Sequence, residues 1–247
     1  MSHQHNNLVR SFVMAAGLVT AAPAVVTAAE PVSASGNIGV YSKYVLRGIQ
    51  AGGGESAGPV LQGGFDLSHS SGAYAGYWAS NLGYADQAGE SGFENDFYAG
   101  YSGEVAGLSY GVGAIYYKYI EISDADAPEI VANIGYGRVT FGAQYLAQDV
   151  VWGNVGDIYW TASAGTDLPK DFSVSATLGY YTYADSGEYI ASTPITSGFR
   201  HLNVSISHPL GDTGAEMSVS GILGGVDRND VSQGSTAVLG LSYGFDI

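Results

Sequence analysis

The chain has 247 residues, of which 23 are acidic and eight are basic, and its formal net charge is −15 at pH 7. A surface of this sign repels phosphate backbones, so nucleic acid is not expected as a partner. The lack of cysteine excludes disulfides, thiolate metal sites and thiol nucleophiles. Gly and Tyr are abundant, with 37 and 19 residues, and this composition favours β-structure over helix.

Residues 1–29 are predicted to be a secretory signal peptide. Arg10 is followed by the apolar run "SFVMAAGLVTAAPAVV" and then by small residues up to Ala29, which is the order of charged, apolar and cleavage regions in such a peptide. A short transmembrane anchor is the alternative, but the run is alanine-rich and shorter than the ~20 residues that a span needs. We therefore expect residues 30–247 to form the mature domain.

From residue 36 onward, apolar and small polar residues alternate in about twelve segments, which is the period of β-strands. In "FSVSATLGYYTYA", for example, Phe172, Val174 and Leu178 share one face, while serine and threonine occupy the other. The predicted strands cover 36–49, 58–70, 72–82, 94–106, 107–119, 129–137, 139–148, 157–167, 172–184, 198–208, 215–225 and 235–247.

The connections between these segments alternate in length. Short connections lie near 70–72, 106–107, 137–138, 168–171 and 209–214, and long ones near 50–57, 83–93, 120–128, 149–156, 185–197 and 226–234. Tight turns on one rim and longer loops on the other indicate an up-and-down meander of hairpins. The fold class is therefore predicted to be all-β.

The chemistry of the two faces favours a membrane barrel over a secreted soluble one. The polar faces carry mostly Ser, Thr, Gly, Asn and Gln, and the charges collect in the long loops. The segments also match the ~9–11 residues that a tilted strand needs to cross a bilayer, whereas soluble strands average ~5–6. Trp78, Trp160 and many tyrosines are expected to form the interfacial girdles.

We expect the barrel to be closed, because lipid offers no hydrogen-bond partners to an unpaired edge strand. Every N–H and C=O group in the hydrocarbon region must be paired internally, so the last strand, 235–247, is expected to pair with the first, 36–49. We predict a transmembrane up-and-down antiparallel β-barrel of about twelve strands in the outer membrane of a Gram-negative bacterium. Outer-membrane lipid and lipopolysaccharide would then be its partners.

The first third of the mature chain resembles the opening of the TorF family of porins. That family begins with an S-x-Y-x-x-R-G element, continues with Gly-Gly-x-Asp, and then has G-x-Y-x-G-x-W-x-S-N. The matching residues are Ser42, Tyr44, Arg47, Gly48, Gly63, Gly64, Asp66, Gly72, Tyr74, Gly76, Trp78, Ser80 and Asn81. The resemblance implies an outer-membrane barrel and says little about a substrate.

If the apolar face meets lipid, the other face lines the lumen. A first strand over 36–49 turns Lys43 and Arg47 inward, beside Asp66 on the next strand. They would form either a charged constriction that selects solutes or an ion-pair network that rigidifies a narrow barrel, with Arg47 bound to Asp66. The predicted pore-lining residues are Lys43, Arg47, Asp66, Glu94, Asp96, Tyr98, Glu129 and Tyr159.

Other chemistry receives little support from the sequence. The acidic segments "SDADAPE" (123–129) and "DRND" (227–230) lack a known calcium-loop spacing, so their charges are attributed to solubility and to bridging anionic lipid. His69, His201 and His208 have no metal-ligand spacing. A Ser–His pair involving His201 or His208, as in outer-membrane phospholipase, has no further support. We therefore expect no enzymatic activity, no cofactor and no metal.

The predicted function is passive diffusion of small hydrophilic solutes or ions. The acidic long loops favour cations at the mouth, although Lys43 and Arg47 argue partly against this preference. The alternative is a structural or surface-interaction barrel without an open pore.

Overall fold

The computed structural model describes residues 31–50, 58–87 and 90–247. The predicted signal peptide and most of the glycine-rich connection at 50–57 therefore lie outside the described residues. In the described part of the chain, no helix is long and apolar enough to cross a membrane.

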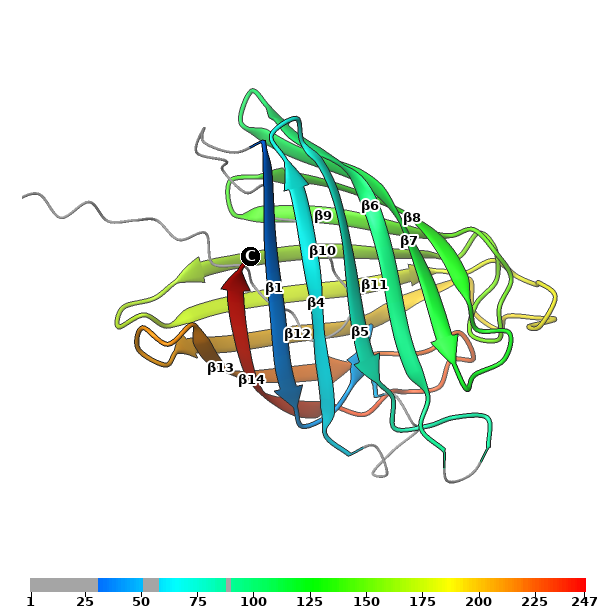
Figure 1. Ribbon diagram of the computed structural model, residues 1–247. Helices are drawn as coiled ribbons and strands as arrows, with labels where there is room; N and C mark the ends of the chain where they lie inside the picture. The colour runs from blue at the N-terminus through cyan, green and yellow to red at the C-terminus, as the bar shows by residue number, and fades with distance from the viewer. Residues whose placement is uncertain (1–30, 51–57, 88–89) are drawn as a thin grey trace, which may run out of the picture.

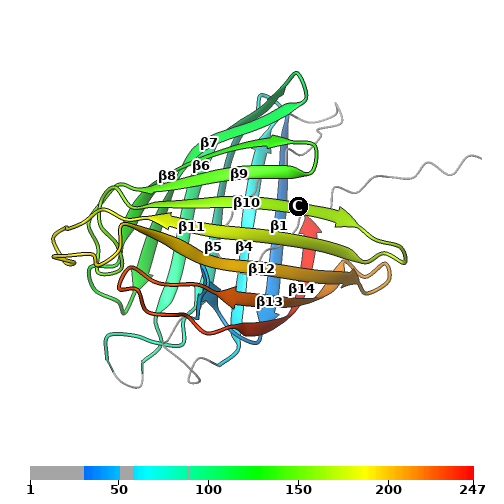
Figure 2. The same cartoon turned by 180° about the vertical axis from the view of Figure 1, so that it is seen from behind.

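Twelve strands in the described part close into one antiparallel barrel (Figure 1; Figure 2). Each strand pairs with its neighbours in sequence, and the ring is completed by pairing between β1 and β14. The wall strands are β1 (Val32–Tyr41), β4 (Val60–His69), β5 (Ala73–Asn81), β6 (Phe93–Val105), β7 (Leu108–Ile120), β8 (Ala127–Tyr136), β9 (Val139–Leu146), β10 (Ile158–Asp167), β11 (Ser173–Thr182), β12 (Ser197–Pro209), β13 (Ala215–Gly224) and β14 (Thr236–Asp246).

The predicted all-β barrel with short turns on one rim and long loops on the other is confirmed. Every predicted strand after the first coincides with an observed strand to within about two residues at each end, which is the usual uncertainty of strand limits. The predicted pairing of the last strand with the first is also confirmed, from Ser35 opposite Asp246 to Tyr41 opposite Gly240.

The predicted first strand over 36–49 is wrong in its second half. The wall strand β1 ends at Tyr41, and residues 42–50 leave the wall and enter the barrel (Figure 1). Ser42 ends the ladder by bonding Leu239 twice, once through its backbone N–H (2.8 Å) and once through its hydroxyl (3.0 Å). We call residues 42–50 the inward hairpin. It contains the short strands β2 (Val45–Leu46) and β3 (Ile49–Gln50), which pair with each other as a separate two-stranded sheet.

The outer surface of the barrel is apolar, as the alternation predicts. On β4, Leu61, Phe65 and Leu67 are each more than half exposed, while Gln62 and Gly64 are buried on the inner face. Trp160 also faces outward, in agreement with a girdle position. Trp78 does not: its ring lies inside, with its centroid 6.1 Å from that of Tyr44. The predicted girdle position of Trp78 is therefore wrong; both faces of β5 mix small and aromatic residues, so alternation does not tell which face meets lipid.

The interior divides into two halves of different chemistry. Near the short turns, the inward positions are mostly small and polar, and hydroxyls pair across neighbouring strands, as in Ser205 with Ser220 (2.6 Å) and Ser163 with Thr177 (3.0 Å). Near the long loops, the lumen is filled by buried aromatic and charged side chains. These include Tyr41, Tyr44, Tyr117, Tyr119, Tyr159, Glu94, Glu129 and Arg47. The inward hairpin lies in this second half.

Candidate functional site

The inward hairpin turns on the dipeptide Arg47-Gly48. Val45 is paired with Gln50 and Leu46 with Ile49, so two residues form the turn. Both have positive φ, 49° at Arg47 and 80° at Gly48, as a type I′ turn requires. A Cβ on Gly48 would meet the side chain of His201 on β12, so the tip of the turn is pressed against the barrel wall. The turn thereby presents the Arg47 side chain to the centre of the lumen.

Arg47 forms a buried ion pair with Glu129 on β8. Two guanidinium nitrogens donate to the two carboxylate oxygens at 2.9 and 2.6 Å, which is the bidentate geometry of a strong charge-assisted pair. The side chains are only 6 % and 1 % exposed. Arg47 also donates to the Tyr181 hydroxyl (2.6 Å) and the Gln144 carbonyl (2.5 Å), and its guanidinium lies 4.8 Å from the ring centre of Tyr159.

The hydroxyl of Tyr117 joins the same cluster, since it accepts from Arg47 at 3.2 Å and donates to Glu129 at 3.0 Å. We call Arg47, Tyr117, Glu129, Gln144, Tyr159 and Tyr181 the arginine hub. It ties the inward hairpin to strands β7, β8, β9, β10 and β11. The Arg47 side chain, at the turn of the inward hairpin, therefore extends across the lumen to these strands.

The predicted pair of Arg47 with Asp66 is wrong. Asp66 accepts from the hydroxyl of Tyr98 at 2.5 Å, further toward the short turns, while Arg47 binds Glu129. Lys43 is also separate from the hub, because its ammonium donates to Thr236 at 2.7 Å. The prediction assumed a continuous strand, and the exit of the chain from the wall at Ser42 moves both basic residues away from Asp66.

A second contact of the inward hairpin involves two carboxylates on β6. Glu94 and Asp96 point inward and are 1 % and 9 % exposed. The hydroxyl of Tyr44 donates to Glu94 at 2.8 Å. The structure therefore brings Arg47, Glu129 and Tyr159 together, places Glu94 and Asp96 beside the same hairpin, and leaves Asp66 with Tyr98 and Lys43 in separate contacts. The pore-lining role of these eight residues stays a prediction.

Strand β12 supplies a second buried arginine through a β-bulge. The register with β11 shifts so that Gly179 faces His201 and Tyr180 faces Phe199, which leaves Arg200 as the extra residue. Arg200 and His201 are consequently both buried, although they are adjacent in sequence. Arg200 donates to the carbonyl of Arg47 at 2.9 Å, and it thus holds the backbone of the turn.

The histidines weighed as catalytic partners have other contacts. His201 shares a hydrogen bond with the hydroxyl of Tyr159 (2.7 Å), and His208 contacts the carbonyl of Lys170 (3.1 Å). Neither contact involves a serine, so no Ser–His pair is formed by these two side chains.

A third arginine links the long loops. Arg228, between β13 and β14, forms an ion pair with Asp157 and donates to the hydroxyl of Thr193 at 3.2 Å. Asp157 also accepts from the backbone N–H groups of Asn154 (3.0 Å) and Ala184 (2.8 Å). Burial raises the pKa of Asp157, and these hydrogen bonds and the charge of Arg228 oppose that rise only in part. Three long loops are thus joined over one side of the barrel mouth.

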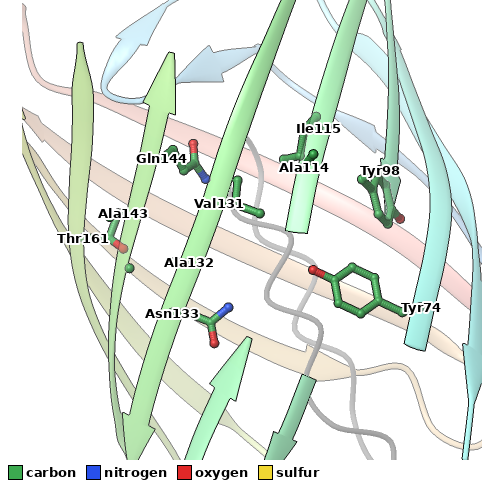
Figure 3. Close-up of a pocket in the computed structure, with 11 residues that line it drawn as sticks. Tyr74, Tyr98, Ala114, Ile115, Val131, Ala132, Asn133, Ala143, Gln144 and Thr161 are labelled. Atoms are coloured by element: carbon green, nitrogen blue, oxygen red, sulfur yellow. The ribbon is translucent and has the colours of Figure 1, made fainter. Parts of the chain in front are cut away.

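A cavity lies next to the arginine hub (Figure 3). It measures about 450 Å³, including the space that is open to solvent. Its polar lining consists of Tyr74, Tyr98, Asn133, Gln144 and Thr161, from β5, β6, β8, β9 and β10, and small or aliphatic residues complete the wall. Gln144 belongs to both the cavity and the hub.

Sequence reasoning missed several of these residues. Alternation runs unbroken through the inward hairpin and would turn Tyr44 toward lipid, whereas its side chain is buried inside and bonds Glu94. Arg200 was missed because a bulge breaks the period of β12, and the adjacent polar pair "RH" at 200–201 is the signal that would have indicated it. Arg228 lies in a loop, where spacing gives no direction for a side chain.

Solved outer-membrane barrels share this fold. The KdgM porin has a TM-score of 0.53 and 10 % sequence identity, covering 86 % of this chain and 99 % of the porin. An outer membrane channel from Pseudomonas putida F1 has a TM-score of 0.52 and 11 % identity, covering 89 % of this chain and 97 % of the channel. At this identity the likeness shows the fold alone, which is a closed antiparallel β-barrel of twelve strands in the described residues.

The sequence also places the protein in a family. Residues 25–193 match the family described as "Bacterial protein of unknown function (Gcw_chp)", and the chain belongs to this family. No curated protein matches the sequence. The comparisons do not confirm the resemblance to the TorF family, which stays a prediction. The outer membrane phospholipase A from Escherichia coli is a weaker structural match, with a TM-score of 0.45 and 9 % identity over 85 % of this chain and 92 % of the enzyme, and it carries no argument here.

Proposed function

We propose that the protein is an outer-membrane channel through which small hydrophilic solutes or ions diffuse passively, and that the inward hairpin forms its constriction. The observation that carries the proposal is the division of the lumen. The half near the short turns is lined by small polar residues, and the half near the long loops is narrowed by the hairpin and the arginine hub. A vestibule lined by small polar side chains that leads to a charged neck would select solutes by size and charge.

Its location is part of the same proposal. The apolar outer surface, the porin-like fold, the resemblance to the TorF family and the predicted signal peptide at 1–29 all support the outer membrane. Lipid and lipopolysaccharide would surround the exposed apolar side chains. The solutes would enter the lumen from either rim.

Conductance measurements test the constriction. Protein refolded from denaturant is inserted into planar bilayers, and we expect small single-channel steps for the native chain. Arg47→Ala should enlarge these steps, because it removes the side chain that spans the lumen. Lys43→Ala is the matched control, since Lys43 belongs to the same hairpin but contacts Thr236 outside the hub. Equal step sizes for all three proteins would refute the hairpin as the constriction.

We also propose a preference for cations. In the half near the long loops, four buried carboxylates accompany three buried arginines: Glu94, Asp96, Glu129 and Asp157 with Arg47, Arg200 and Arg228. The buried carboxylates and arginines largely offset one another, so the preference rests on the acidic long loops, which raise the local concentration of cations at the mouth. The reversal potential under a salt gradient measures this preference, and an anion-selective value would contradict it.

A barrel without an open pore is the second candidate, with a structural or surface-interaction role. It is favoured by the tight burial of the inward hairpin, in which Tyr44, Val45 and Arg47 are only 2 %, 3 % and 6 % exposed. The same bilayer recordings separate the two candidates. Folded protein that inserts but never conducts would refute the channel and support this role.

A further inference from the structure

We propose that the cavity beside the arginine hub is a binding site for an uncharged polyhydroxylated solute, such as a neutral sugar. The inference rests on the proposed function, because it names the class of solute that the channel would hold. It comes from three properties of the cavity: its polar groups, its lack of charge and its position in the lumen.

Three polar side chains of the cavity wall form no hydrogen bond with the described residues. Within the described residues, no hydrogen bond engages the hydroxyls of Tyr74 and Thr161 or the amide of Asn133. Figure 3 shows Tyr74 and Asn133 pointing toward the same space from opposite walls. Hydroxyl groups and an amide together offer both donors and acceptors. A solute with several hydroxyls can satisfy all three.

Among the described residues, the lining carries no charged side chain. The residues that surround the cavity are tyrosine, alanine, isoleucine, valine, asparagine, glycine, glutamine and threonine. Asp66 lies outside the lining and accepts a hydrogen bond from the hydroxyl of Tyr98, which is a lining residue. A charged solute would lose hydration in this space without gaining a partner of opposite charge, and that loss is costly. The cavity therefore favours neutral solutes.

The position of the cavity suits capture during passage. Its space of about 450 Å³ includes the part that is open to solvent, so the cavity is a recess that a solute can enter from the lumen. Gln144 forms part of its wall and also accepts from Arg47, so a solute in the cavity lies directly against the constriction. Such a site would hold a solute before the neck rather than on the outer surface.

The test uses equilibrium binding, which does not depend on conduction. Glucose is titrated into the full-length mature protein in detergent micelles, and binding is followed by saturation-transfer NMR. Gluconate and glucosamine serve as charged analogues of similar size. We expect glucose to bind at least tenfold more tightly than either analogue. Absence of glucose binding, or tighter binding of a charged analogue, would overturn the proposal.

Variants of the cavity locate the site. Tyr74→Phe and Asn133→Ala should each weaken glucose binding about three- to tenfold, the loss expected for one neutral hydrogen bond. Ser205→Ala is the control, because it removes an inner-wall hydroxyl that pairs with Ser220 outside the cavity. Equal binding by wild type and both cavity variants would overturn the assigned position.

The two proposals fail separately. Glucose binding in micelles without conductance in bilayers would refute the channel and leave the site standing. Conductance without glucose binding would refute the site and leave the channel standing.

Discussion

The buried pair of Arg47 and Glu129 provides the sharpest test of the lumen. Replacing Arg47 by Met leaves a carboxylate that is 1 % exposed without its partner. Breaking a buried ion pair by removing one member costs about 3–5 kcal/mol, because the remaining charge stays desolvated. Glu129→Leu should cost a similar amount for the same reason. Replacing both residues removes both charges, so the double variant should lie within about 2 kcal/mol of the native chain.

The measurement is a double-mutant cycle in urea. Protein folded into liposomes is unfolded by urea, and tryptophan fluorescence follows the transition. With a slope of about 2 kcal/mol per molar urea, each single variant should shift the midpoint down by about 1.5–2.5 M. Lys43→Met is the matched control, because its single bond to Thr236 contributes only about 0.5–1.5 kcal/mol.

Two outcomes would refute this reasoning. If each single variant costs less than about 1 kcal/mol, the pair is not desolvated and the lumen at this level is filled with water. If the two losses simply add in the double variant, the side chains do not interact.

Further predictions concern the turn, the loops and the tryptophans. Gly48→Ala should destabilise the protein by more than about 1 kcal/mol in urea, because alanine disfavours positive φ and its Cβ would meet His201; an unchanged midpoint would contradict the turn. Arg228→Gln should speed limited proteolysis of the long loops, and an unchanged rate would argue against the tie to Asp157. In single-tryptophan variants, brominated lipid should quench Trp160 but not Trp78, and strong quenching of Trp78 would place it outside.

The wall of the barrel could be predicted because lipid and lumen impose opposite chemistry on alternate residues. On β14, Leu239, Leu241 and Tyr243 face outward, and the small residues between them, Gly240 and Ser242, face inward. The same rule correctly turned Glu94, Asp96, Glu129 and Tyr159 inward, since all four lie on regular wall strands. The alternation of apolar and small polar residues therefore predicts the direction of a side chain where its strand is regularly paired in the wall.

The pattern failed where residues leave that pairing. In the inward hairpin, alternation continues although neither face meets lipid, so Tyr44 was assigned to the wrong environment. At the bulge of β12, two adjacent residues face the lumen, which no strict period of two allows. Alternation also does not predict contacts across the lumen. The contact of Arg47 with Glu129 joins the turn of the inward hairpin to β8, which is not a neighbour of β1 in the barrel.

The inward hairpin gives a physical reason for the S-x-Y-x-x-R-G element. Ser42 ends the wall ladder, Tyr44 bonds a buried carboxylate, and Arg47-Gly48 forms a turn that only a small second residue permits. Each residue type is therefore required by the hairpin rather than by a membrane strand. A chain that carries this element at the end of its first wall strand is expected to fold it into the lumen, provided that another strand supplies a carboxylate for the arginine.

The use of scarce positive charge follows from the same arrangement. Three of the eight basic residues, Arg47, Arg200 and Arg228, are buried arginines in the half of the lumen near the long loops. Buried carboxylates such as Glu129 and Asp157 are tolerable only when they are paired, and arginine offers several donors in a fixed plane. Arg47 thus compensates Glu129 and Arg228 compensates Asp157, whereas Arg200 holds the turn by donating to the carbonyls of Arg47 and Val226.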